Sequence, residues 1–131
     1  MREIKVKTNK RNEMIDITSE IEKIVQDEKL ENGIITVYVP HTTAGVTINE
    51  GADPDVQRDI IDKLGSLIPE NEGYKLMEGN SYAHIKSSLL GPSQTIIVNN
   101  GKLVLGTWQH VFFYEGDGPR TRKMFIETVK K

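Results

Sequence analysis

The sequence predicts a single α+β domain over residues 1–131, in which hairpins of β-strands are interrupted by short helices. The first observation is the β-branched run Ser93–Asn99, followed by the turn pair Asn100-Gly101 and a long apolar segment, which together predict a hairpin. The second observation is that amphipathic segments with helical spacing do not alternate regularly with the strands. This order argues against a doubly wound parallel sheet.

The N-terminal region is expected to form two strands and a helix. Residues alternate between polar and apolar in Arg2–Thr8, which predicts the first strand, and Glu13–Ile17 is expected to pair back with it. Either Thr18 or Asp16 can cap a helix that runs through Leu30, because apolar residues recur there at helical spacing.

The next segment is expected to contain two strands and a second helix. Asn32-Gly33 supplies the left-handed residue that ends the first helix. The strands follow at Ile34–Val39 and Ala44–Asn49. Asp53-Pro54 is a strong helix start, an Asp cap followed by proline at the first helical position, and Pro69 stops that helix.

The C-terminal region is expected to form a short helix and three strands. The helix covers Ala83–Leu90 and is closed by Gly91-Pro92. Lys102–Tyr114 is predicted as one long return strand, in which Gly106 indicates a bulge or a close backbone approach. Arg120–Val129 alternates again and is predicted as the last strand.

Composition excludes several classes of function. The net charge of −2 gives no reason to expect binding to nucleic acid or to an anionic membrane. No apolar run approaches the length of a membrane span, and no signal-peptide pattern is present. The absence of cysteine excludes a disulfide framework, a thiolate zinc site and a cysteine nucleophile, and it fits a cytoplasmic protein. Charged residues make up 27% of the chain, which is typical of a thermophilic protein.

The three histidines suggest a metal site. His41 follows a strand, His84 lies on a short helix and His110 lies two residues past the only tryptophan, while Glu50 and Asp53 supply carboxylates. Two histidines and a carboxylate can bind a divalent metal such as Zn or Mg and leave positions open for water or substrate. The candidates come from different elements, so ordinary solvated histidines and a helix-capping role for Asp53 remain alternatives.

Hydroxyl and basic side chains suggest an anion site. His84, Ser87 and Ser88 share one face of the short helix, and its first residues add unpaired backbone N–H groups. Lys86 and Arg122 have a plain alternative as exposed charges. The residues that could together hold a phosphate are Thr42, Thr43, Lys86, Ser87, Ser88, Arg120 and Arg122. No P-loop, GxGxxG or GxSxG pattern is present.

Three stretches of the chain resemble the YjbQ-like family, whose members are described as secondary thiamine-phosphate synthases. They are HTTAGVTINEGADPDVQRDI at 41–60, AHIKSSLLGPS at 83–93 and NGKLVLGTWQ at 100–109. The resemblance implies an α+β domain with a curved mixed, largely antiparallel sheet. It also implies a homotrimer with sites near the subunit boundaries and a bound divalent metal or anion.

The resemblance further implies a site around His41, Asn49, Glu50, Asp53, His84, Ser88, Thr107, Trp108, Gln109 and Arg120. Together with the histidine and hydroxyl patterns above, it leads to the following expectations. The expected metal ligands are His41 and His84, with His110 as a third candidate. Glu50, Asp53, Trp108 and Gln109 are expected to take part in catalysis. The residues expected to bind substrate or anion are Thr42, Thr43, Asn49, Ser87, Ser88, Thr107 and Arg120.

His110 departs from the family pattern, because the residue after GTWQ is usually small there and often glycine. This histidine either adds an imidazole to the site or fills space that a substrate would occupy. The loop Glu115–Gly118 also looks shorter than its usual counterpart, so no role is assigned to its residues.

Three functions are compatible with these residues. The first is a transferase that joins a pyrimidine-methyl diphosphate to a thiazole phosphate. A divalent metal with Arg and hydroxyl donors would stabilise the departing diphosphate, and Trp108 would lie beside a flat cationic ring. The second is another metal-dependent enzyme acting on a small phosphorylated metabolite, with Glu50 or Asp53 as general base. The third is a non-catalytic protein that binds a metal or a phosphorylated ligand.

Overall fold

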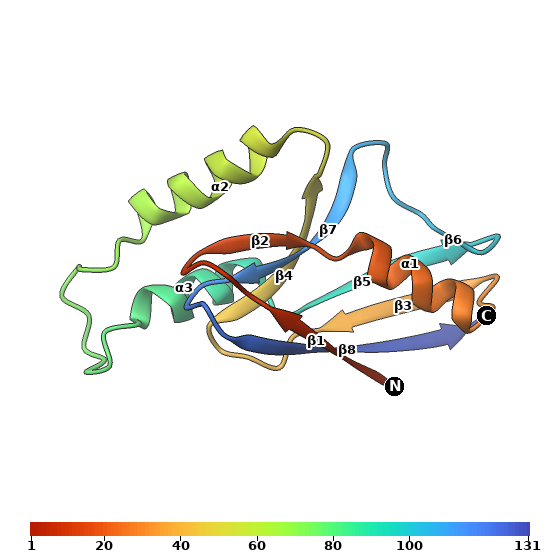
Figure 1. The fold of residues 1–131 in the computed structure, drawn as a ribbon, viewed down its shortest axis with the longest axis horizontal. Coiled ribbons are helices and arrows are strands. Elements are labelled where there is room, and N and C mark those ends of the chain that lie inside the picture. The colour runs from red at the N-terminus through yellow and green to blue at the C-terminus, as the bar shows by residue number, and fades with distance from the viewer.

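The computed structural model describes all residues, 1–131, as strands packed in two antiparallel sheets with three helices (Figure 1). The elements are β1 (Arg2–Lys7), β2 (Glu13–Asp16), α1 (Thr18–Asp27), β3 (Gly33–Tyr38), β4 (Ala44–Glu50), α2 (Pro54–Leu67), α3 (Ser81–Leu90), β5 (Ser93–Asn99), β6 (Lys102–Leu103), β7 (Gln109–Glu115) and β8 (Thr121–Lys130). The five-stranded sheet has the order β1-β8-β3-β5-β6, and the three-stranded sheet has the order β2-β7-β4. The α+β prediction is therefore confirmed, although every strand pair is antiparallel and the sheet is not mixed.

The hydrophobic core joins both sheets to α1. Ile21, Ile24 and Val25 form the buried side of α1, as the helical spacing predicts. Apolar side chains from β3, β5 and β8 of one sheet and from β4 and β7 of the other complete the cluster. Alternation along β7 divides its side chains, so that Val111 and Phe113 belong to this core while Phe112 and Tyr114 are buried on the opposite face.

The prediction of one return strand over Lys102–Tyr114 is wrong. The hairpin at Asn100-Gly101 forms as expected, since both residues have positive φ angles. After two residues the chain leaves the five-stranded sheet and turns at Gly106, whose N–H donates to Gln109 Oε1 at 2.8 Å. Gln109 then begins β7, the central strand of the other sheet.

The first helix ends earlier than predicted. The N-cap residue is Ile17 and has no side-chain cap, so neither Thr18 nor Asp16 takes the predicted cap position. Asp16 lies one residue earlier, and its Oδ1 accepts from the N–H of Thr18, the first helical residue, at 3.0 Å. The helix ends at Asp27, and Lys29, with φ of 52°, is the left-handed residue. Asn32-Gly33 is therefore not the terminator: Gly33 begins β3, where a Cβ would lie 2.1 Å from Val129 O.

The second helix begins where the sequence predicts, whereas α3 begins at Ser81, two residues before the predicted start at Ala83. Asp53 caps α2 by accepting from the Asp55 N–H at 2.9 Å, with Pro54 at the first position. No residue of α2 is buried, and the helix stands away from the sheets (Figure 1). In contrast, α3 packs on β4 and buries Tyr82 and Ala83. None of the helices is both long and apolar enough to cross a membrane.

Candidate functional site

Five predicted site residues meet in one open pocket between α3 and the loop that precedes β4. The cavity has a volume of about 290 Å³, and Ala44 and Pro92 complete its wall. The predicted residues that line it are His41, Thr42, His84, Ser87 and Ser88. The structure thus brings together predicted site residues from two separate stretches of the chain, 41–42 and 84–88.

Local structure explains how the pocket forms. The three- and four-residue spacings of α3 put His84, Ser87 and Ser88 on one face of the helix. Gly45 lets β4 approach the end of α3 closely, because a Cβ there would lie 2.8 Å from Gly91 O. The start of β4 and the preceding loop are thereby placed against the polar face of α3.

A backbone hydrogen bond defines which nitrogen of His41 carries the proton. Its Nε2 accepts from the Lys123 N–H at 3.0 Å, so in the neutral ring Nδ1 carries the hydrogen. Burial, and after it the Arg122 guanidinium, hold the pKa of His41 below its ordinary value. His41 is thus a neutral imidazole with one N–H to donate.

The hydroxyl groups of the pocket differ in how well they are satisfied. Ser88 Oγ donates to the His84 carbonyl at 3.0 Å. Ser87 Oγ is buried and has no hydrogen-bond partner in the chain. An unsatisfied buried hydroxyl costs free energy, so a ligand that supplied an acceptor to Ser87 would gain from the interaction.

A buried ion pair lies beside the pocket, and the sequence analysis missed it. Arg122 is 3% exposed and donates to both carboxylate oxygens of Glu115, which is fully buried, at 2.7 and 2.5 Å. Its NH2 group also donates to Thr43 Oγ1 at 2.8 Å. Arg122 is therefore not an exposed strand charge. Thr43 accepts a hydrogen bond from this ion pair and does not line the pocket. The only sequence signal was that Arg122 alternates in phase with the core residues Met124 and Ile126.

Lys86 is also buried instead of exposed. Its Nζ lies 5.1 Å from the centre of the Tyr82 ring, and only 3% of the residue is accessible. Burial lowers its pKa. The side chain lies on the inner side of α3 and does not line the pocket.

Two further predicted residues have structural roles away from the pocket. Arg120 binds Asp117, donating from NH2 to Oδ2 at 3.1 Å and from Nε to the backbone carbonyl at 3.0 Å. Asp53 caps α2 and lies on the surface. The structure therefore does not bring either side chain to His41 and His84.

The remaining predicted residues lie at the opposite end of the β4–β7 ladder. Asn49 pairs with His110 and Glu50 with Gln109, and the turn before β7 carries Thr107 and Trp108. β4 runs from Ala44, at the pocket, to Glu50, which is a span of about 20 Å at roughly 3.3 Å per residue. The predicted site thus consists of two separate groups within one chain, the pocket and a group that we call the far end: Asn49, Glu50, Thr107, Trp108, Gln109 and His110.

The residues of one chain do not form a ligand set for a divalent metal. No group of three His, Cys, Asp or Glu side chains has the required proximity. The pocket contains two imidazoles and no carboxylate, and the Nε2 of His41 already accepts a hydrogen bond. This donor set suits an anion better than a cation.

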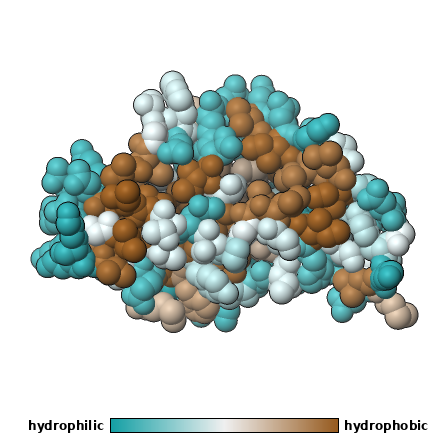
Figure 2. Space-filling view, turned by 180° about the vertical axis from the view of Figure 1, so that it is seen from behind, coloured by the Kyte–Doolittle hydropathy of each residue, from teal (hydrophilic) through white to brown (hydrophobic).

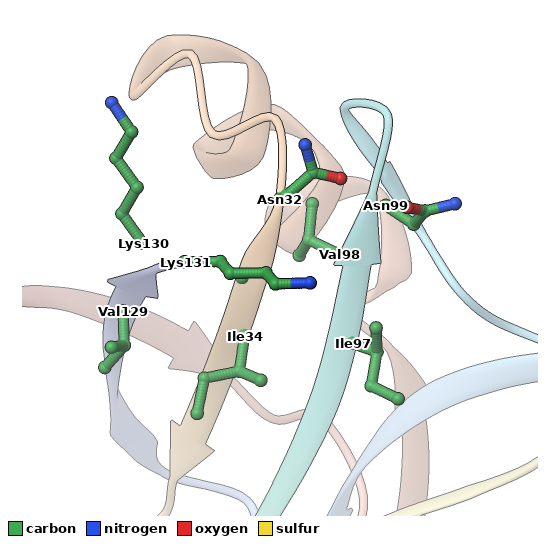
Figure 3. Close-up of a pocket in the computed structure, with 9 residues that line it drawn as sticks. Asn32, Ile34, Ile97, Val98, Asn99, Val129, Lys130 and Lys131 are labelled. Carbon is green, nitrogen blue, oxygen red and sulfur yellow. The ribbon is translucent and has the colours of Figure 1, made fainter.

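A second hollow, of about 360 Å³, lies on the outer face of the five-stranded sheet (Figure 3). Ile34, Ile97 and Val129 form an exposed apolar row across β3, β5 and β8, and Lys131 lies across these strands. On the face opposite to the one seen in Figure 1, hydrophobic side chains cover broad areas of the surface (Figure 2). The hollow contains no histidine, carboxylate or hydroxyl group that could carry chemistry.

Comparisons with known proteins agree closely over the whole chain. The family model described as "UPF0047 protein YjbQ-like" matches residues 2–131. A UPF0047 protein of Methanocaldococcus jannaschii is 56% identical over 95% of this chain and 90% of the relative. The UPF0047 protein YugU of Bacillus subtilis is 51% identical over 98% of each chain.

Solved structures show the same fold. A YjbQ/UPF0047-family protein from Clostridium acetobutylicum superposes with a TM-score of 0.97 at 51% identity, covering 98% of this chain and all of that one. A hypothetical protein from Aeropyrum pernix K1 superposes with a TM-score of 0.94 at 36% identity, covering 99% and 98% of the two chains.

Proposed function

The chain belongs to the YjbQ-like family of UPF0047 proteins, and from this premise we propose that it is an enzyme acting on a small phosphorylated metabolite. The specific activity that we propose is a thiamine-phosphate-synthase-like transfer, which joins a pyrimidine-methyl diphosphate to a thiazole phosphate. The phosphate or diphosphate group binds in the pocket between His41 and α3.

The donor set of this pocket is the observation that supports the proposal. His41 Nδ1–H and the hydroxyls of Thr42 and Ser87 are donors, and no carboxylate lines the cavity to repel an anion. Burial, and after it the charge of Arg122, lower the pKa of His41, and Arg122 is itself paired with Glu115. The neutral N–H and O–H donors are therefore the groups that stabilise negative charge on a phosphate oxygen.

The chemistry of the transfer makes use of such donors. The thiazole nitrogen attacks the methylene carbon of the pyrimidine, a C–N bond forms, and the C–O bond to the diphosphate breaks. The diphosphate leaves with the electron pair of that bond. Donors that stabilise the growing charge on the leaving oxygen lower the barrier of this step. The residues of one chain do not by themselves supply a ligand set for the divalent metal, Zn or Mg, so this step is derived from the N–H and O–H donors alone.

The first experiment measures anion binding by calorimetry with inorganic phosphate and pyrophosphate. Ser87→Ala removes one hydroxyl donor and is expected to weaken pyrophosphate binding about tenfold, since a hydrogen bond to a charged group contributes on the order of 1.5 kcal/mol. Ser66→Ala is the matched control, because Ser66 Oγ donates to Lys63 O on α2, which does not line the pocket. Equal binding by wild type and Ser87→Ala contradicts the assignment of the pocket.

The second experiment tests turnover. The protein is incubated with the two thiamine precursors, and the product is detected by mass spectrometry. Formation of thiamine phosphate supports the transferase. Hydrolysis of simple phosphoesters without it indicates a different phosphate-dependent enzyme, and tight anion binding without any product indicates a binding protein.

We also propose that the chain assembles as a homotrimer, in which a second copy brings its far end to the pocket. Two features support assembly: α2 has an apolar side but no buried residue, and Ile34, Ile97 and Val129 are exposed. Light scattering coupled to size-exclusion chromatography tests this, and a monomer at micromolar concentration contradicts it. Binding to nucleic acid is not part of the proposal, and the cytoplasmic location stays a prediction.

A further inference from the structure

The imidazole of His110 is held in place by a carboxylate that the sequence analysis assigned only to helix capping. Asp16 Oδ2 lies 2.5 Å from His110 Nδ1, although the two residues are 94 positions apart. The other oxygen, Oδ1, accepts from Thr18 Oγ1 at 2.6 Å and from the Thr18 N–H at 3.0 Å. Partial burial by itself raises the pKa of Asp16, but the hydrogen bonds from Thr18 and His110 outweigh it and leave that pKa below its ordinary value. Asp16 is therefore a fixed, ionised acceptor.

The ring of His110 is also confined by its packing. A Cβ on Gly51 would lie 2.1 Å from His110 Cγ, so the ring fills the space that a side chain at position 51 would need. On the strand itself the ring stacks against Phe112, with centroids 6.4 Å apart and an angle of 23° between the planes. Nδ1 is bound to Asp16 and no hydrogen bond uses Nε2, so Nε2 is the free nitrogen of the ring. The His110 side chain is partly exposed.

An aromatic surface is attached to the same point of the backbone. The turn before β7 leaves Trp108 61% exposed, and this turn is closed by Gln109. The Gly51 N–H donates to Trp108 O at 2.9 Å. The turn is therefore hydrogen-bonded to the same residue against which the His110 ring packs. Asn49 lies opposite His110 in β4, and its Oδ1 is occupied by the Glu50 N–H, which leaves its NH2 group to donate.

We propose that Asp16 and His110 form a proton-transfer dyad for a ligand with a flat ring that stacks on Trp108. His110 Nε2 takes a proton from an O–H or N–H group of the ligand, while Nδ1 stays protonated and bound to Asp16. The resulting imidazolium is stabilised by the ionised carboxylate, and the proton then returns from Nε2 to a leaving group or to water. Asp16 is the positioning residue of this pair. The identity of the ringed substrate rests on the proposed function, but the dyad does not.

The first test uses Asp16→Asn, which separates orientation of the imidazole from the contact with Thr18 at the start of α1. The Oδ1 of asparagine can accept from the Thr18 N–H as the aspartate does, so this contact is retained. Its NH2 group can donate to Nδ1, which places the ring hydrogen on Nε2 and removes the free nitrogen. Acylation of His110 by diethyl pyrocarbonate, followed by peptide mass spectrometry, is expected to slow roughly tenfold or more in this variant. Equal acylation rates in wild type and Asp16→Asn overturn the proposal.

Two internal controls accompany this measurement. His41 and His84 in the same digest report any general change in reactivity. Asp62→Asn removes a carboxylate from an exposed position on α2 and is expected to leave acylation of His110 unchanged. A loss that is equally large in Asp62→Asn would show that charge in general, and not the dyad, sets the reactivity.

A second variant pair tests the packing without relying on Asp16. Gly51→Ala alone displaces the ring and is expected to lower both the melting temperature and the acylation of His110. Gly51→Ala in a His110→Gly background has no ring to displace, so its melting temperature is expected to match that of His110→Gly. A full destabilisation in both backgrounds contradicts the proposed confinement of the ring.

Turnover separates this proposal from the proposed function. With a substrate that the wild type converts, Asp16→Asn and His110→Gln are each expected to lower kcat, and the double variant no further than the larger single loss. If the wild type converts no phosphorylated substrate, the proposed function fails while the acylation result stands. If it does convert one and both variants keep the wild-type kcat, the dyad is refuted.

Discussion

Replacement of Glu115 by alanine tests the buried ion pair that lies beside the pocket. Glu115 is fully buried and Arg122 is 3% exposed, so the variant leaves a guanidinium in the interior without its carboxylate partner. It also removes the acceptor of the Asp117 N–H, which Glu115 Oε1 receives at 2.8 Å. The only side-chain acceptor that Arg122 keeps is Thr43 Oγ1.

The expected loss is a large share of the total stability. Removal of one partner of a buried ion pair costs about 3–5 kcal/mol, because the other charge remains desolvated. A single domain is stable by about 5–15 kcal/mol, so Glu115→Ala is expected to remove roughly a fifth or more of this free energy. Glu3→Ala is the matched control, since the Glu3–Lys123 pair is half exposed at 3.9 Å and contributes about 0–1 kcal/mol.

The assay is urea unfolding followed by far-UV circular dichroism, at one fixed protein concentration because assembly would make the stability concentration-dependent. The double variant Glu115→Leu with Arg122→Met replaces both charges by apolar side chains and is expected to recover most of the loss. Two results refute the reasoning. They are a Glu115→Ala variant within about 1 kcal/mol of wild type, and a double variant no more stable than Glu115→Ala.

Three further predictions concern pH, metal content and helix capping. The pKa of His41 is lowered in the folded state, so the unfolded chain binds a proton at higher pH than the folded chain does. Stability is therefore expected to fall as the pH drops below about 6.5. His41→Asn is expected to flatten this part of a plot of urea midpoint against pH, and an unchanged slope contradicts the prediction. Since no third ligand lies near His41 and His84, desalted wild type and His84→Ala are expected to carry the same zinc by elemental analysis; a metal bound only by the wild type would indicate ligands from a second copy. Asp53→Ala is expected to lose about 1 kcal/mol in unfolding experiments and to keep its pyrophosphate affinity, because Asp53 caps α2 away from the pocket; a weakened affinity would return Asp53 to the site.

Local chemistry explains what was predicted correctly. Asp53-Pro54 starts α2 and Asn100-Gly101 closes the β5–β6 hairpin, because capping and positive φ angles depend on neighbouring residues alone. The shared face of His84, Ser87 and Ser88 follows from helical geometry, which places residues three and four positions apart side by side.

Errors arose where a choice between partners had to be made. Lys102–Tyr114 has the pattern of one strand, but periodicity does not say which sheet a strand joins, and the turn at Gly106 divides the segment between two sheets. Arg122 alternates in phase with buried residues, yet only contact with Glu115 shows why a charge can occupy that position.

The sequence by itself determined the α+β class, the family and the residues of the pocket on α3, since these depend on local spacing and on recognisable motifs. The tertiary structure decided the distances between motifs. It separated the far end from the pocket by the length of β4, buried Arg122 against Glu115, and joined His110 to Asp16 across 94 residues. Such contacts depend on how strands pair across the sheets, and that pairing is set by the packing of the whole core.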